Sequence, residues 1–214
     1  MDIEFFGANC VRLKTKETTI VVDDNLSLMG GKTITTDKTS LFYTNKMLVD
    51  QSAKSKARLT IETAGEFEVG DLTVTGQQTR GHMDEKDIES ATVFQFMSGT
   101  QTVTVLGHVH PDLSKEVVEL IGGTDVLMIP VGGNGYTLDG VAASSIVRKA
   151  EPAVVIPTYY NGGKLQFEVP AQTLEEFFKI SALSQPEESV DVFKLSKASD
   201  VESGSTKVVV LKAK

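Results

Sequence analysis

Three residues with metal-binding side chains stand two positions apart in the segment "VLGHVHPDLS" (residues 105–114): His108, His110 and Asp112. In an extended segment, alternate residues lie on one face, roughly 6.5 to 7 Å apart, so two imidazoles at this spacing can approach one metal ion. Catalytic zinc usually has three protein ligands and a water molecule, and structural zinc has four protein ligands. The two histidines are therefore half of a metal site, and the rest of the chain has to supply the other ligands.

Few other residues can supply those ligands. The only other histidine of the chain, His82, lies in the polar loop "TRGHMDEKD". A histidine in such a loop is more often solvated than bound to a metal. Asp23 ends the apolar run "TIVVD"; a buried carboxylate there needs polar partners and either serves a site or caps a turn. The single cysteine, Cys10, excludes an intramolecular disulfide and a zinc site with several cysteines, and its apolar neighbours favour a buried structural thiol.

Two glycine-rich segments suggest phosphate binding at first sight. "MGGKT" at residues 29–33 lacks the required glycine five positions before Gly31 and the helix that should follow, so we interpret it as a turn between strands. In "IPVGGNGYTLDG", an apolar strand passes through three glycines and reaches a helix that Thr137 is expected to cap. Amides at such a helix start can bind an anion. Because the dinucleotide spacing and a lysine are both missing, a pocket wall is favoured over a phosphate site.

Composition bounds the class of protein. The 214 residues are 40% hydrophobic and 23% charged, as in an ordinary soluble globular protein, and their number suits one domain over residues 1–214. No apolar run approaches the ~20 residues that span a bilayer, and "MDIEFFGANC" does not resemble a signal peptide, so we expect a cytoplasmic location. A net charge of −8 without a basic patch opposes binding to nucleic acid or to an anionic membrane.

The first half of the chain predicts β-structure. Short runs rich in Val, Ile, Thr and Phe are separated by Gly, Asp, Asn and Ser. The segments "EVGDLTV" and "FMSGTQTV" predict hairpins that turn at Gly70-Asp71 and Ser98-Gly99. Runs this closely spaced predict antiparallel sheet.

The second half alternates strand-like runs with three helical patterns, in residues 113–122, 138–150 and 171–183. Ser114 is expected to cap the first of these helices. Alternating strands and helices predict crossover units. Together the two halves predict an α/β (α+β) fold in which two sheets pack together with helices outside.

The order of these segments resembles that of the metallo-β-lactamase-fold superfamily. The resemblance covers nearly the whole chain, from "MDIEFFGANCVRL" to the closing "KVVVLK", and its most specific part is "TDVLMIPVGGNGYTLDG" followed by "PAVVIP". The most similar branch is a small bacterial and archaeal group known as Zn-dependent hydrolases of the β-lactamase fold. The resemblance implies a four-layer αββα sandwich, in agreement with the strand and helix patterns.

The resemblance also implies that most metal ligands of the family are replaced. In "FYTNKMLVDQ", Asn45 and Met47 stand at the places of two histidines, and Asp50 at the place of a third. His108 stands where the family has a metal-bridging aspartate, and Tyr159 stands at the last histidine. The residues that the resemblance places in the former cleft are Asn45, Met47, Asp50, His82, His108 and Tyr159.

Three histidines cannot build the five-histidine dinuclear centre of the family. In the family's mechanism a hydroxide bridges two metals. This chain therefore lacks the ligands that would hold the two metals. His82 lies in the region of the family's middle His-Asp pair and is the candidate for a retained ligand. The His-x-His-x-Asp spacing at residues 108–112 is then interpreted as fortuitous.

We expect a degenerate metallo-β-lactamase-fold protein that lacks the dinuclear site and a cofactor, and that acts as a non-catalytic binding or interaction module for a small polar ligand or a protein partner. The alternative is a mononuclear metal-dependent hydrolase of esters, lactones or phosphodiesters, with one zinc or other divalent ion bound by His82, His108 and Asp50 and with Tyr159 near the reacting oxygen. A metal-free enzyme has no signature in the sequence. Exposed edge strands allow a homo-oligomer.

Overall fold

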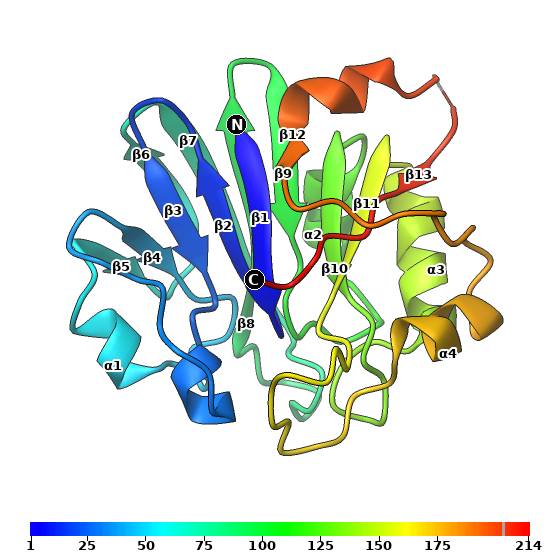
Figure 1. Ribbon diagram of the computed structural model, residues 1–214, viewed down its shortest axis with the longest axis horizontal. Helices are drawn as coiled ribbons and strands as arrows, with labels where there is room; N and C mark the ends of the chain where they lie inside the picture. The colour runs from blue at the N-terminus through cyan, green and yellow to red at the C-terminus, as the bar shows by residue number, and fades with distance from the viewer. Residues whose placement is uncertain (203) are drawn as a thin grey trace.

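The computed structural model describes residues 1–202 and 204–214, and it contains two β-sheets packed face to face (Figure 1). The first sheet contains, in spatial order, β12 (Phe193–Lys194), β1 (Asp2–Gly7), β2 (Cys10–Lys14), β3 (Thr19–Val22), β4 (Ser40–Phe42) and β5 (Leu59–Ile61). The second sheet contains, in spatial order, β13 (Lys207–Val208), β11 (Val154–Thr158), β10 (Val126–Pro130), β9 (Gln101–Val105), β8 (Ala91–Ser98), β7 (Leu72–Thr79) and β6 (Gly65–Val69).

Helices cover the outer face of the second sheet, and short helical elements lie at one end of the first sheet (Figure 1). The helices on the second sheet are α2 (Lys115–Ile121), α3 (Gly140–Ala150) and α4 (Leu174–Ile180). The short elements beside the first sheet are α1 (Gln51–Lys54) and the 3₁₀ turn η1 (Leu26–Met29), and a second 3₁₀ turn, η2 (Leu195–Asp200), follows β12. The result is the αββα sandwich that the resemblance implies. None of the helices in the described residues is long and apolar enough to cross a membrane.

Apolar side chains from both sheets form the main core. Phe42 of the first sheet packs edge-on against Phe94 and Phe96 of the second sheet, with ring centroids 5.2 Å apart in both pairs. All three side chains are fully buried, and each edge-to-face pair adds about 0.5–1.5 kcal/mol to the gain from burial. Residues as distant in sequence as Ile3 and Leu211 lie in the same core, which is consistent with one domain.

Both predicted hairpins are present. Val69 pairs with Leu72 across the turn at Gly70-Asp71, as predicted. In the second hairpin Ser98 still pairs, with Gln101, so the turn lies at residues 99–100, one position later than predicted. Ser114 caps α2 by accepting a hydrogen bond from the Val117 N–H, also as predicted.

Two local predictions are wrong. β3 pairs with β4, and β4 with β5, in parallel and not antiparallel register. The connections between these strands are long and contain η1 and α1, and parallel neighbours require such crossovers. The cap of α3 is Asp139, whose side chain accepts from the Ala142 N–H, and not Thr137. A carboxylate is the better cap because it also interacts favourably with the positive end of the helix dipole.

Parallel pairing in the second sheet positions the candidate site. β10 is parallel to both β9 and β11. The carboxyl ends of parallel strands meet at one edge of a sheet, which is where ligands bind in open α/β sheets. The loops that follow these three strands lie at the lower edge of the molecule in Figure 1. In chain order they contain His108, the glycine-rich turn 131–139 and Tyr159.

Candidate functional site

Three aromatic rings meet at the carboxyl ends of β9, β10 and β11. His108 packs edge-on against Tyr136 and Tyr159, with centroid distances of 5.0 and 4.5 Å, and the two tyrosine rings stack at 5.7 Å. His108 is 7% exposed and Tyr159 is 3% exposed. These rings fill the centre of the cleft, and we call His108, Tyr136 and Tyr159 the aromatic partition.

Burial keeps the aromatic partition uncharged. It lowers the pKa of His108 to about 4, although the carbonyl of Tyr136 acts in the opposite direction. Burial likewise raises the pKa of Tyr159 well above its ordinary value. The Nδ1 atom of His108 lies 3.4 Å from the Tyr136 carbonyl oxygen. Because a carbonyl only accepts, this contact favours the neutral tautomer with its proton on Nδ1 and with Nε2 as an acceptor.

The glycine-rich turn after β10 brings Tyr136 into the aromatic partition. A Cβ atom at Gly132 would lie 2.3 Å from the Tyr159 carbonyl oxygen, so the close packing of the two loops requires glycine. Tyr159 has a φ of +50°, which is uncommon for an aromatic residue, and its N–H donates to the Ala8 carbonyl at 2.6 Å. The turn lines a pocket, as predicted, whereas nothing in the sequence spacing distinguishes Tyr136 within it.

The aromatic partition separates two pockets. The histidine pocket has a volume of about 160 Å³ and is lined by Asn45, Met47, Leu48, His82, Met83, Asp84, Ser90, His108 and Tyr136. The tyrosine pocket has a volume of about 100 Å³ and is lined by Ala8, Asn25, Leu28, Met29, Leu48, His108, Tyr136, Tyr159, Gln166 and Glu168. Every residue that the resemblance places in the former cleft lines one of these pockets, except Asp50. Neither Asn25 nor Glu168 lies in a recognisable motif, so sequence patterns do not identify these two residues.

Asp84 stabilises the wall of the histidine pocket. Its carboxylate accepts hydrogen bonds from the N–H groups of Gly81 and Ser90, at 2.7 and 2.8 Å, and from the Ser90 hydroxyl at 2.8 Å. Burial alone would raise the pKa of Asp84, but these hydrogen bonds outweigh burial and lower the pKa below its ordinary value. Asn45 donates to the same Ser90 hydroxyl at 3.3 Å. The loop that carries His82 is therefore fixed by an ionised carboxylate.

His82 is half-buried and lines the same pocket as Asp84. Its Nδ1 atom lies 3.3 Å from the Val109 carbonyl oxygen, and burial lowers the pKa of the ring below its ordinary value. The rings of His82 and His110 are 6.3 Å apart. His110 lines neither pocket, and its Nδ1 atom accepts from the N–H of Asp112 at 3.1 Å. The residues with the metal-like spacing at 108–112 thus do not converge on one point.

Asp50 lies outside both pockets and caps α1. Its side chain accepts hydrogen bonds from the N–H groups of Ser52 and Ala53, at 2.8 and 3.4 Å, and from the Ser27 hydroxyl. The residue is 2% exposed. These contacts give Asp50 a structural role, whereas the mononuclear alternative requires it as a metal ligand.

Asp50→Ala is expected to lower the free energy of unfolding by about 1–2 kcal/mol, because the helix cap is lost. Asp50→Asn keeps one acceptor oxygen and should lose less. Urea denaturation measures both changes, and metal analysis of the same samples should show no difference from the wild-type protein. Unchanged stability together with altered metal content would contradict the capping role.

The Asp23 side chain fixes the position of Thr44, the residue that precedes Asn45. Its carboxylate accepts from both the N–H group, at 2.8 Å, and the hydroxyl group of Thr44. Burial raises the pKa of Asp23 to about 6, and the two hydrogen bonds from Thr44 act in the opposite direction. Of the two roles considered from the sequence, these contacts support the stabilisation of a turn.

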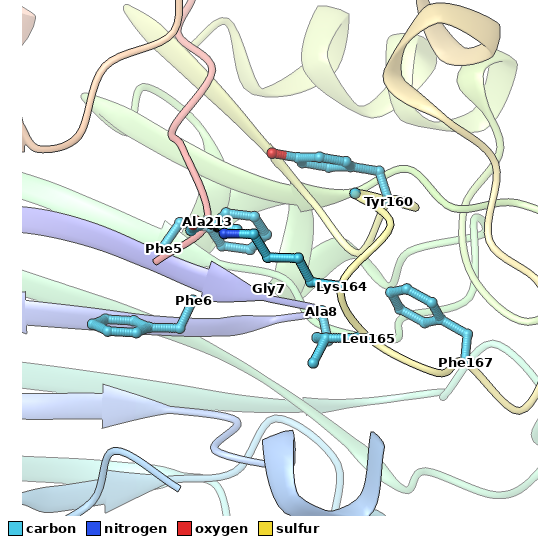
Figure 2. Close-up of a pocket in the computed structure, with 10 residues that line it drawn as sticks. Phe5, Phe6, Gly7, Ala8, Tyr160, Lys164, Leu165, Phe167 and Ala213 are labelled. Atoms are coloured by element: carbon cyan, nitrogen blue, oxygen red, sulfur yellow. Dashed lines mark hydrogen bonds between the residues drawn. The ribbon is translucent and has the colours of Figure 1, made fainter. Parts of the chain in front are cut away.

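A third pocket shows how the loop between β11 and α4 is fixed. This apolar pocket has a volume of only about 20 Å³. Figure 2 shows Leu165 beside Ala8 at the end of β1, and Lys164 extended toward Ala213. The Lys164 Nζ atom donates to the Ala213 carbonyl at 3.1 Å. The loop 161–170 is thereby anchored to the end of the chain, and it also supplies one wall of the tyrosine pocket.

The residues of the cleft do not fit a dinuclear metal centre. Asn45, Met47 and Tyr159 offer an amide, a thioether and a neutral phenol where the resemblance implies histidine ligands, whereas zinc in proteins is bound by Cys, His, Asp and Glu. Within residues 1–202 and 204–214, no group of three or more His, Cys, Asp or Glu side chains is arranged so that it could hold one ion.

An αββα sandwich with its cleft at the loop edge of the sheets is the fold of a metallo-β-lactamase. The family model of the β-lactamase superfamily domain matches residues 2–159, and the chain belongs to the metallo-β-lactamase superfamily. No curated protein matches the chain at a significant level.

Solved structures agree with this assignment. A protein of the metallo-β-lactamase superfamily from Thermotoga maritima is 22% identical, with a TM-score of 0.67 over 99% of both chains. Igni18, a metallo hydrolase from the archaeon Ignicoccus hospitalis, is 18% identical, with a TM-score of 0.59 over 90% of this chain and 98% of its own. An isothiocyanate hydrolase from Delia radicum gut bacteria is 9% identical, with a TM-score of 0.65 over 100% and 97%. At these identities the similarity concerns the fold and not the activity.

Proposed function

We propose that this member of the metallo-β-lactamase superfamily is a non-catalytic binding protein that holds a small polar ligand in the cleft at the carboxyl ends of β9, β10 and β11. The observation that carries the proposal is the aromatic partition, which places a buried neutral imidazole and two neutral phenols at the centre of the cleft. Such groups orient a ligand by hydrogen bonds and apolar contact. They do not supply the charge that activates a water molecule.

The two pockets have the character of small-molecule sites. Ligand pockets are concave, mostly apolar and provided with a few well-placed polar groups. The histidine pocket combines Met47 and Met83 with the polar groups of Asn45 and His82. This combination supports binding of a ligand that carries both apolar surface and hydrogen-bonding groups.

One observation favours the mononuclear hydrolase as a second candidate. The Nδ1 atoms of His82 and His108 lie 3.3 and 3.4 Å from backbone carbonyl oxygens. Metal-binding histidines usually make such a contact with one nitrogen and bind the metal with the other. Two histidines, however, are one ligand fewer than the three protein ligands of a catalytic zinc site. Because of this missing ligand, we rank the mononuclear hydrolase below the binding protein.

Metal analysis separates the two candidates. The protein, purified without a histidine tag from cells grown with added zinc, manganese and iron, is dialysed and its metal content is measured. We expect a content well below one metal per chain, equal in the wild-type protein and in His108→Gln and His82→Gln variants. About one metal per chain that is lost in both variants would overturn the proposal in favour of the hydrolase.

A further inference from the structure

Two exposed methionines lie at one pocket of the cleft. Met47 and Met83 are 74% and 69% exposed, more than any other large apolar side chain in residues 1–202 and 204–214. Both line the histidine pocket. Single exposed apolar residues are normal on a protein surface. Two of the same type at one pocket instead indicate a use for the thioether group.

Hydrogen bonds join the two loops that carry these methionines. The carbonyl of Ser90 accepts from the N–H group of Lys46, the residue before Met47, at 3.1 Å. The hydroxyl of Ser90 donates to the carboxylate of Asp84, the residue after Met83, at 2.8 Å. Each methionine is therefore one position from a residue that Ser90 holds, and the two thioethers enter the pocket from loops that are fixed to each other.

His82 offers a nitrogen atom to the same pocket. Its Nδ1 atom lies 3.3 Å from the Val109 carbonyl oxygen, which favours the tautomer with the proton on Nδ1 and a lone pair on Nε2. Among the described residues nothing donates to this Nε2 atom, and it is not one of the fully buried polar atoms that lack a partner. The Nε2 lone pair is therefore accessible to a bound ion.

Two thioethers and an imidazole are ligands for a soft metal ion. Methionine sulfur selects copper(I), whereas zinc in proteins is bound by Cys, His, Asp and Glu. The methionine side chain is unbranched and has a polarisable sulfur, so the exposed Met47 and Met83 can turn toward an ion without disturbing the core. Asp84 also lines the pocket and adds a negative charge that favours a cation.

From the two exposed thioethers, the accessible His82 nitrogen and the pocket that they share, we propose that the histidine pocket binds copper(I). The ligands are the Sδ atoms of Met47 and Met83 and the Nε2 atom of His82. The copper stays in the +1 state, and binding forms coordinate bonds only. This inference goes beyond the proposed function, because it assigns a soft-metal site to a cleft that lacks the ligands for a zinc centre.

His108 distinguishes this site from the mononuclear alternative, which requires it as a ligand. The His108 ring is 7% exposed and packs edge-on against Tyr136 and Tyr159. A metal ion bound to this ring would have to displace packed aromatic side chains, whereas His82 and the two methionines are reached without such a rearrangement. The copper(I) site therefore needs no histidine other than His82.

The first test uses silver(I), a soft analogue of copper(I) that is stable in air, and NMR of the full-length protein with ¹³C-labelled methionine methyl groups. One equivalent of silver nitrate is added in a buffer without chloride. We expect the methyl signals of Met47 and Met83 to shift, while those of Met97 and the buried Met128 stay unchanged. No shift, or a shift of Met97 as large as those of Met47 and Met83, would overturn the inference.

Variants identify the ligands, with the affinity for copper(I) measured without oxygen by competition with bicinchoninate. Met47→Leu and Met83→Leu keep the apolar character and approximate volume but remove the sulfur, and both positions are exposed, so the variants should fold. Each variant, and His82→Gln, should bind copper(I) about tenfold more weakly or worse. Met97→Leu is the matched control, because Met97 is exposed in β8 and lines neither pocket, and it should bind like the wild-type protein.

Two results of these measurements would overturn the inference. Wild-type affinity in both Met47→Leu and Met83→Leu would show that the thioethers only line the pocket. Loss of copper(I) binding in His108→Gln, with full binding in both methionine variants, would assign the ion to a two-histidine site. The proposed function is tested separately, by the content of zinc, manganese and iron, so its failure is distinguishable from failure of the copper(I) site.

Discussion

Gly107→Ala is expected to lower the free energy of unfolding by about 2–5 kcal/mol. Gly107 has a φ of +63°, and a Cβ atom there would lie 2.0 Å from the Thr44 hydroxyl oxygen and 2.4 Å from the Thr44 Cβ atom. The left-handed backbone is unfavourable for alanine by about 1–2 kcal/mol, and displacement of a buried neighbour adds about 1–3 kcal/mol. Thr44 cannot move without weakening its hydrogen bonds to Asp23.

Gly99→Ala is the matched control for this change. Gly99 has nearly the same φ, +64°, in the turn between β8 and β9, but a Cβ atom there would meet no other atom within 4 Å. Gly99→Ala should lower the free energy of unfolding only by the backbone contribution of about 1–2 kcal/mol. Urea denaturation of both variants measures the difference between them, which isolates the contact with Thr44. Equal losses in the two variants would show that Thr44 moves aside freely.

His108→Gln is expected to make the folded protein more stable as the pH falls from about 7 to about 4.5. The pKa of His108 is lowered by burial to about 4, so below its ordinary pKa of 6.5 the unfolded state binds more protons than the folded state. Between about pH 7 and pH 4.5 this group therefore lowers the stability by about 2 kcal/mol. Asp23 acts in the opposite direction, because its pKa is raised from 3.8 to about 6 and the folded state binds the extra proton.

These two buried groups should nearly cancel in the wild-type protein. On acidification from about pH 7 to about pH 4.5, His108→Gln should gain about 2 kcal/mol from Asp23 alone, and Asp23→Asn should lose about 2 kcal/mol from His108 alone. Urea denaturation at both pH values tests this, and the change with pH is compared within each variant. If the stability of both variants changes with pH as that of the wild-type protein does, then neither His108 nor Asp23 titrates as its burial requires.

The sequence predicts the second half of the fold better than the first. Alternating strand and helix patterns after residue 100 leave one arrangement, a parallel sheet with outer helices, and this places His108 and Tyr159 at one edge. In the first half, the short runs at β3, β4 and β5 are compatible with either pairing, since η1 and α1 are too short to give a periodic signal. Pairing there is decided by the path of long connections, which local patterns do not encode.

The candidate site was predictable only where a motif marks it. Asn45 and Tyr159 are found through the resemblance because each stands at a recognisable place in a motif, and His82 because it lies in the region of the family's middle His-Asp pair. Asp50 shares such a place, yet its carboxylate points to the N-terminus of α1, and sequence spacing does not give side-chain direction. Asn25 and Glu168 reach the tyrosine pocket from segments more than 100 residues apart, so only the tertiary structure brings them together.

The aromatic partition has a consequence for the energetics of binding. His108 and Tyr136, together with Leu48, form walls of both pockets, so any ligand that displaces these side chains in one pocket changes the shape of the other. Two occupants of the cleft are then thermodynamically linked, and the factor by which the first alters the affinity of the second is the same in both directions. A shared wall of three side chains thus gives this cleft the basis for reciprocal coupling between two small molecules, without any movement of the sheets.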